Sequence, residues 1–438
     1  MCRIPNKTML DINLIRTKPE YVKERLAAKG CKADIDELLA MDAEKRALMT
    51  RVEDKKAEQN RVSKLIPQMK KAGEDVSAVM TEMKTLSEDI RVMDAELNEK
   101  TAKIKTFVDA LPNLPDDDVI PGGKENNKVV YVYGEKPQFD FAAKDHVELA
   151  TTLGLVDYPR GAKLGGNGFW IYKGLGAQLE WALINFFIEC HLADGYEFML
   201  PPHILTYQCG YTAGQFPKFE EDVFSLQEDA KDGKFNFFML PTAETALINY
   251  HRDEILTEDE LPKKYFAYTP CYRREAGSYR ANERGMIRGH QFNKVEMFQY
   301  TVPENSDAAL DELIRKAEYI VEKLGLHYRL SKLAAEDCSA SMAKTFDVEV
   351  WLPSMNEYKE VSSASNAKDY QARRGNIRFR RNATKKVEYL HTLNASGMAT
   401  SRLLPAILEQ HQQADGSVVI PECLRKFMGG REKIEPLK

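Results

Sequence analysis

The chain has 438 residues, which exceeds one ordinary domain and predicts two. Its 43% hydrophobic and 29% charged residues are typical of a soluble globular protein, and no apolar run approaches the roughly 20 residues of a membrane span. The net charge of -5 predicts no general affinity for nucleic acid, so any such binding must be local. Seven cysteines without a CxxC pair indicate neither a zinc site nor a disulfide framework and favour a reducing cytoplasm.

The first hundred residues have helical patterns. Residues 17–29 predict a short helix. Apolar residues then recur in alternating steps of three and four from Leu38 to Met69 and from Val79 to Leu111. Because only a short break at residues 71–73 separates these runs, we expect an antiparallel hairpin, a rod of roughly 50 Å.

The charge of this hairpin is asymmetric, with an excess of cations on its first helix. Its cations are Lys45, Arg46, Arg51, Lys55, Lys56, Arg61, Lys64, Lys70 and Lys71, whereas the returning helix is net acidic. Two interpretations are open: a solvated helix face, or a basic edge that binds a nucleic-acid backbone.

The rest of the chain mixes helices and strands. A linker rich in proline, glycine and acids covers 111–123, an amphipathic helix is expected over 174–196, and an apolar strand over 198–204 contains prolines typical of an edge or a bulge. Two adjacent strands follow at 344–354 and 357–363, and then a loop that enters the last helix from residue 395. This order predicts an α+β fold with an antiparallel sheet, and no Rossmann or P-loop glycine motif is present.

An arginine-rich stretch joins two apolar strands between Tyr268 and Phe298. Its arginines are Arg273, Arg274, Arg280, Arg284 and Arg288, and its acids are Glu275, Glu283 and Glu296. Guanidinium groups bind phosphate oxygens through paired hydrogen bonds, so the loop is suited to a triphosphate. A solvated charged hairpin is the other interpretation, although Phe292 and Glu296 share one strand face beyond the loop.

Four motifs in order carry a resemblance to a known family. They are YRREAG with RGHQFNKVE (272–277 and 288–296), PTAE (241–244), YKEVSSASN (358–366) and HTLNASGMATSRLLPAILE (391–409). Together they resemble the seryl-tRNA synthetase family of class II aminoacyl-tRNA synthetases. The resemblance extends along almost the whole chain from about Met9. It implies activation of serine with ATP and its transfer to tRNA(Ser), and to tRNA(Sec) where that exists.

The resemblance implies an ATP site made of Arg273, Arg274, Glu275, Arg288, Phe292, Glu360, Val361, Ser362, Ser363 and Arg402. In it Arg273 contacts the α-phosphate, while Arg288 and Arg402 hold the outer phosphates; these three are the expected catalytic residues. Glu275 accepts from the adenine amino group, and Phe292 stacks on the ring. A helix N-terminus, where Arg402 is expected, favours phosphate.

A magnesium ion is also implied, with Glu360 and Ser363 as its ligands. Magnesium prefers hard oxygen donors and few protein ligands. Strand alternation places Glu360 and Ser363 on opposite faces, so a bulge is needed to bring them together.

The implied serine site contains Thr242, Ala243, Glu244, Arg273, Glu296, Thr392, Asn394 and Ser396. Glu244 lies near the ammonium group and Glu296 accepts the hydroxyl. A site that hydrogen-bonds a hydroxyl rejects alanine strongly, because its buried polar groups would lose their partner.

The resemblance further implies two domains and a homodimer. Residues 1–112 form a tRNA-binding domain whose arm spans about 31–111, and 113–438 form the catalytic domain. The helix and strand over 174–204 resemble the dimer contact called motif 1. We expect a cytoplasmic enzyme without zinc or membrane association.

The sequence departs from the usual family pattern at several positions. Ala364 stands where cysteine is more common, and Ala395 and Ser401 where glycine is more common. These departures leave open a paralogue that protects its host against a serine-mimicking antibiotic. A ligase that loads a carrier protein and a catalytically inactive RNA-binding protein are further alternatives, disfavoured by the intact arm and by the retained Arg273, Glu360 and Arg402.

Overall fold

The computed structural model describes residues 10–226, 236–275 and 285–437. The chain divides into two compact units, Met1–Ala27 with Cys31–Leu111 and Ala28–Gly30 with Pro112–Lys438. In the described residues no helix is long and apolar enough to cross a membrane.

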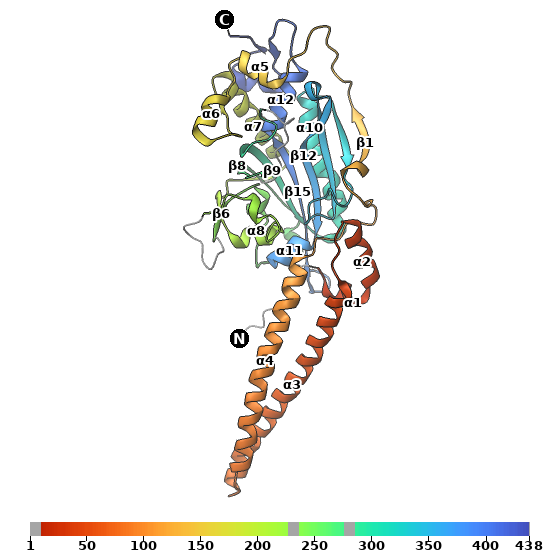
Figure 1. Cartoon of the computed structure of the whole chain (residues 1–438), viewed down its shortest axis with the longest axis vertical. Coiled ribbons are helices and arrows are strands. Elements are labelled where there is room, and N and C mark those ends of the chain that lie inside the picture. Colours follow the sequence, from red (N-terminus) through yellow and green to blue (C-terminus); the bar gives the residue numbers. More distant parts are fainter. Residues whose placement is uncertain (1–9, 227–235, 276–284, 438) are drawn as a thin grey trace. The chain divides into compact units, whose positions relative to one another are not determined.

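The first unit is a long helical hairpin with two short helices before it (Figure 1). The short helices are α1 (Ile12–Thr17) and α2 (Pro19–Ala28), and the hairpin consists of α3 (Ile35–Lys71) and α4 (Ser77–Ala110). The Asp34 side chain accepts from the backbone N–H of Glu37 and so caps α3. Gly73, with φ of 76°, permits the turn between the two long helices. The predicted hairpin is confirmed.

Ion pairs between the helices reduce the charge asymmetry expected of this hairpin. Lys55 of α3 pairs with Asp89 of α4 at 2.6 Å and Lys56 with Asp94 at 2.8 Å, while Lys100 of α4 pairs in the opposite sense with Glu44 of α3 at 2.8 Å. The basic edge is therefore partly neutralised by the helix beside it.

The second unit is built on an eight-stranded sheet in the order β1-β10-β11-β12-β15-β9-β8-β4. The bounds are β1 (Lys128–Tyr133), β10 (Tyr328–Lys332), β11 (Lys344–Leu352), β12 (Glu357–Lys368), β15 (His391–Ala399), β9 (Gln291–Thr301), β8 (Lys263–Tyr272) and β4 (Glu197–Met199). All neighbours are antiparallel except β4 and β8. The α+β prediction is confirmed. The single strand predicted over 198–204 is wrong, because the edge strand β4 ends at Met199, and Pro201 and Pro202 lie between it and β5 (Ile204–Thr206).

Helices α7 (Leu175–Ala193), α10 (Ser306–Lys323) and α12 (Thr400–Gln410) cover the apolar side of this sheet (Figure 1). Val295 and Met297 of β9 and Leu393 and Ala395 of β15 pack with these helices in the main core. Because side chains alternate along a strand, Lys294, Glu296 and Asn394 project to the opposite face. That face carries the polar residues discussed below.

Smaller elements surround the sheet. They are α5 (His146–Thr152), α6 (Tyr158–Gly165), α8 (Tyr207–Ala213), α9 (Glu244–Leu247), α11 (Tyr370–Gly375), α13 (Glu422–Arg425), β2 (Val156–Asp157), β3 (Ile171–Tyr172), β5 (Ile204–Thr206), β6 (Phe237–Met239), β7 (Ile255–Thr257), β13 (Arg378–Arg380), β14 (Val387–Tyr389), β16 (Val418–Val419) and β17 (Lys433–Ile434).

Two local predictions for the C-terminal part of the chain are wrong. The segment from Ala395 to Ala399, expected as a loop, continues strand β15 beside β9. Its pairing shifts register between Ser396 and Ala399, and Met398 has φ of 117°. The glycine and the small residues therefore mark a bulge in a strand, and α12, expected as the last helix, is followed by α13.

Candidate active site

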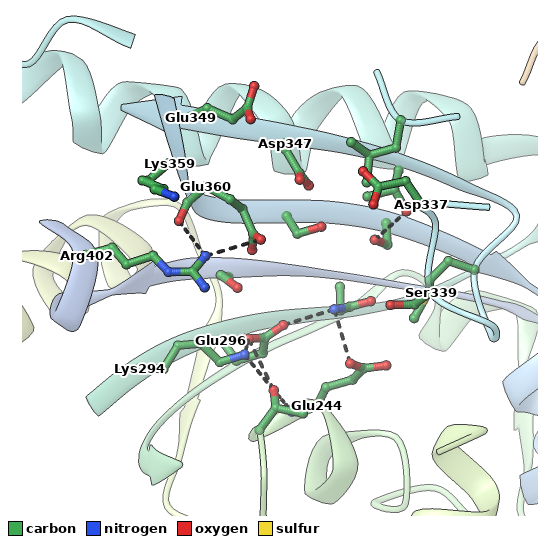
Figure 2. A pocket seen from close by; sticks show the side chains of 18 of the residues that line it. Glu244, Lys294, Glu296, Asp337, Ser339, Asp347, Glu349, Lys359, Glu360 and Arg402 are labelled. Atoms are coloured by element: carbon green, nitrogen blue, oxygen red, sulfur yellow. Dashed lines mark hydrogen bonds and ion pairs between the residues drawn. The ribbon is translucent and has the colours of Figure 1, made fainter. Parts of the chain in front are cut away.

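A cavity of about 400 Å³ opens on the polar face of the sheet. Figure 2 shows Glu244, Lys294 and Glu296 gathered on one side of it, and Glu360 with Arg402 on another. Their elements are far apart in the chain: α9, β9, β12 and the start of α12. The fold therefore brings all four sequence motifs to one cavity, and Asn394 and Ser396 of the last motif line it as well as Arg402.

Glu296 lies at the floor of this cavity with its side chain fully buried. It forms an ion pair with Lys294 at 2.6 Å and accepts from Asn394 Nδ2 at 3.0 Å. Lys294 Nζ also donates to Thr242 Oγ1 at 2.7 Å. A buried carboxylate is costly unless it is paired and hydrogen-bonded, and this network supplies both kinds of partner for Glu296.

Glu244 begins α9 and faces Glu296 across Asn394. Its carboxylate accepts from Gln371 Nε2 at 2.7 Å and from Asn394 Nδ2 at 3.4 Å. Burial, and next the negative charge of Glu296, raise the pKa of Glu244 to about 7. Thr392 donates to Gln371 at 2.8 Å and so fixes the amide that holds Glu244. Two carboxylates thus converge where a small cationic ligand with a hydroxyl would fit.

A second cavity of about 80 Å³ lies beside the first and is lined by Glu275, Arg288, Phe292, Val361 and Arg402, among others. The Arg273 guanidinium lies 5.2 Å from the centre of the Phe292 ring and donates to the Pro241 carbonyl at 3.2 Å. Arg288 forms an ion pair with Glu275. A planar ring with arginines on its rim suits a nucleotide base and its phosphates.

The bulge expected in β12 is present. Val348 pairs with Ser362 and Glu349 with Glu360, so Val361 is the extra residue. Glu360 and Ser363 consequently both line the larger cavity. Arg402 Nη1 donates to the Glu360 carbonyl at 2.8 Å and lies 3.3 Å from its carboxylate.

Asp347 lies opposite Ser363 in the strand pair, with its carboxylate turned toward the cavity (Figure 2). It is 8% exposed, and its Oδ1 atom has no hydrogen-bond partner. Burial, and next the charge of Glu360, raise the pKa of Asp347 well above its usual range. An unpartnered oxygen beside Glu360 and Ser363 completes a set of hard donors of the kind that magnesium prefers. Within the described ranges, no three His, Cys, Asp or Glu side chains are grouped to hold a metal ion.

Four predicted site residues do not line these cavities. Ala243, Ser362 and Thr392 are fully buried, and the Ser362 hydroxyl donates to the Ser396 carbonyl at 2.5 Å. The Arg274 backbone N–H donates to the Asp222 carbonyl. Arg280, Glu283 and Arg284 of the arginine-rich loop lie outside the described residues.

Sequence reasoning missed three residues of the site: Lys294, Gln371 and Asp347. Lys294 lies on the same strand face as Glu296, so alternation alone could have predicted it. Gln371 reaches Glu244 only because α11 packs beside β15, so no local sequence pattern indicates its role. Asp347 looked like one acid in an ordinary alternating strand.

Comparisons with known proteins agree with this geometry. A family model described as the seryl-tRNA synthetase N-terminal domain matches 9–115, and one described as the tRNA synthetase class II core domain (G, H, P, S and T) matches 224–411. Serine–tRNA ligase 2 of Clostridium acetobutylicum is 66% identical, with 96% of this chain and 99% of that protein covered. Serine–tRNA ligase of Thermodesulfovibrio yellowstonii is 45% identical, with 96% and 99% covered.

A solved structure gives the same result for the fold. The seryl-tRNA synthetase of Pyrococcus horikoshii, crystallised with ATP, has a TM-score of 0.90 and 33% identity, covering 98% of this chain and 100% of its own. Similarity of this extent covers the helical hairpin, the sheet and all four motifs. The chain therefore belongs to the seryl-tRNA synthetase family, and its activity is that of a serine–tRNA ligase that uses ATP.

Proposed function

We propose that the buried network around Glu296 selects serine for this reaction. The fully buried carboxylate, held by Lys294 and Asn394 at the floor of the cavity, carries the proposal. It accepts the serine hydroxyl, and alanine leaves it without that partner. Glu244 balances the ammonium group, and Thr242 and Ser396 line the same cavity.

The serine carboxylate then attacks the α-phosphorus of ATP and releases pyrophosphate. Arg273 neutralises charge on the α-phosphate, and its neighbour Phe292 stacks on adenine. Glu275 accepts from the adenine amino group, which requires its ion pair with Arg288 to open. Arg288 is thereby released toward the outer phosphates, which it holds with Arg402. Catalysis here is positioning and charge neutralisation and needs no covalent nucleophile.

A magnesium ion fits the oxygen donors of β12 and its neighbour. Glu360 and Ser363 would hold it, and the unpartnered Oδ1 of Asp347 is the structural feature that supports this assignment. When bound, the ion supplies charge neutralisation between phosphate groups.

The helical hairpin is the proposed tRNA-binding arm. Arg51, Lys64, Lys70 and Lys71 of α3 are exposed, as contacts to a phosphate backbone require. The transfer step places serine on tRNA(Ser), and on tRNA(Sec) where that exists.

A homodimer is proposed through α7 and the strands after it. Trp181 is 52% exposed, Leu200 73% and Ile204 53%, which is unusual for large apolar side chains in a monomer. A cytoplasmic location fits a chain whose described cysteines are all free thiols.

The alternative of an antibiotic-protecting paralogue rests on the departures from the family pattern. Ala364 and Ala395 are cross-strand partners in the main core, on the side away from the cavity. Where the usual pattern has a larger cysteine and a smaller glycine, this chain has two alanines, so the two changes in side-chain size compensate each other. The groups around Glu296 are not altered. Only Ser401 lines a cavity, the smaller one.

Serine-dependent exchange of pyrophosphate into ATP tests the proposal, with alanine and threonine as competitors. We expect exchange with serine, and at least about a hundredfold lower kcat/KM for alanine because Glu296 loses a charge-assisted hydrogen bond. Comparable exchange with alanine would contradict the role of Glu296.

A further inference from the structure

A buried glutamate behind the active site joins three elements. Glu180 of α7 is 3% exposed, and its Oε1 atom accepts from Asn293 Nδ2 at 2.8 Å and from Thr400 Oγ1 at 2.6 Å. Thr400 Oγ1 also lies 3.1 Å from the Asn293 carbonyl oxygen. Asn293 belongs to β9 and Thr400 is the first residue of α12, so one carboxylate oxygen links a helix, a strand and the start of a second helix.

Both partners of Glu180 are next to residues of the ATP half of the site. Asn293 lies between Phe292 and Lys294 on β9, and alternation turns its side chain to the helix side of the sheet. Thr400 precedes Arg402 by two residues in the first turn of α12. Displacing either Asn293 or Thr400 therefore moves a side chain that lines the smaller cavity.

The position of Glu180 is costly for an acid. Among the described residues, no lysine or arginine lies within ion-pair distance of it, and burial raises its pKa to about 7. A methionine or leucine would fill such a site in a helix core without this cost. The feature that an apolar residue cannot supply is the acceptor atom shared by Asn293 and Thr400.

We propose that Glu180 is a positioning residue for ATP: it fixes β9 and the start of α12 against α7, so that Phe292 and Arg402 hold their places. The inference rests on the proposed roles of these two residues in binding ATP. It concerns geometry only, because Glu180 lies on the far side of the sheet from the reacting atoms and contacts none of them.

The chain contains a matched control for this idea. Glu318 of α10 is also a fully buried glutamate, and burial raises its pKa to about 7. Its ion-pair partner is Arg315 of the same helix, and neither residue lines the cavities of the site. Loss of any buried carboxylate affects packing in both places, whereas only Glu180 is bonded to β9 and α12.

The test uses the full chain in serine-dependent pyrophosphate exchange. Glu180→Met removes the acceptor at similar volume, and we expect a rise of about tenfold in the KM for ATP with the KM for serine changed less than about threefold. Glu180→Gln keeps the Oε1 acceptor and should restore the KM for ATP to within about threefold of the native value. Glu318→Met should leave both constants near native.

Two further variants make the outcome decisive. Thr400→Val removes only the hydroxyl and should raise the KM for ATP in the same direction, which keeps the test valid where Glu180→Met does not fold. Equal rises for ATP and serine, failure of Glu180→Gln to restore ATP binding, or the same effect from Glu318→Met would overturn the proposal. Phe292→Ala distinguishes failure of the proposed ATP site from failure of the positioning role. If Phe292→Ala leaves the KM for ATP unchanged, the proposed role of Phe292 is wrong. If Phe292→Ala raises the KM for ATP but Glu180→Met does not, only the positioning role of Glu180 is wrong.

Discussion

The hairpin and the sheet use the same charged residue types in opposite ways. In the hairpin, the Lys55 and Asp89 side chains of one ion pair are 36% and 49% exposed. In the sheet, Lys294 and Glu296 are 7% and 1% exposed and share their hydrogen bonds with Thr242 and Asn394. Exposed pairs are screened by water and contribute little, whereas buried charges persist only within a complete network. We therefore expect single charge changes in the hairpin to have small effects on tRNA affinity, and single charge changes in the buried network of the sheet to impair serine activation.

Removal of the hairpin should have the largest effect, and it should affect tRNA charging but not serine activation. Replacing residues 36–109 by a short flexible linker should lower tRNA charging by roughly a thousandfold or more, since phosphate contacts supply much of tRNA affinity. Serine-dependent pyrophosphate exchange should stay within about threefold, because every residue assigned to ATP or serine lies in the other unit. Charging and exchange assays on a folded deletion protein check this.

Two results would contradict that division of labour. One is collapse of exchange in a protein with a native melting profile. The other is tight tRNA binding that persists without the hairpin. Native tRNA binding should also weaken steeply as salt is raised, because lysine and arginine contacts release counterions.

Glu296→Gln tests the buried network at one atom. The change keeps size and removes a charge-assisted hydrogen bond worth about 1.5–3 kcal/mol, so the KM for serine should rise about ten- to a hundredfold. The KM for ATP should change little, and alanine should lose much less than serine because it never made the bond. Steady-state exchange kinetics with both amino acids measure this.

Glu275→Gln is the matched control for Glu296→Gln. Glu275 lines the smaller cavity and pairs with Arg288, so its change should weaken ATP and spare serine. If instead Glu296→Gln raises the KM for ATP, or harms serine and alanine equally, then Glu296 does not bind the hydroxyl.

The raised pKa of Glu244 should make the KM for serine depend on pH. The exposed acids of the hairpin should cause no such dependence. The pKa of Glu244 is raised to about 7 by burial and then by the charge of Glu296, and the serine ammonium group requires its ionised form. As pH falls from 8 to 6 the ionised fraction drops about tenfold, so the KM for serine should rise by about that factor. Glu244→Gln should bind serine weakly with no such pH step. A native KM that is flat from pH 6 to 8 would refute this role.

Periodicity explains which parts were predictable. The hairpin follows from its heptad seam, and the sheet strands follow from alternation, including the bulge that Glu360 and Ser363 require. The continuation of β15 through Gly397 was not predictable, since glycine between small residues reads as a loop until a neighbouring strand pairs with it. The roles of Gln371 and Glu180 were not predictable for a similar reason, because their contacts with residues distant in the sequence exist only after tertiary packing.

The smallest expected effect concerns one exposed ion pair of the hairpin. Asp89→Asn removes the acid that pairs with Lys55, and because both side chains are exposed, the free energy of unfolding should change by less than about 1 kcal/mol. The same change leaves Lys55 available to phosphate, so tRNA affinity at moderate salt should increase by about twofold. Lys55→Met is the control, with an equally small effect on stability and a decrease in tRNA affinity. Thermal unfolding and tRNA titration of both variants decide the matter: a large loss of stability in either would show that hairpin charges, like those of the sheet, hold the fold together.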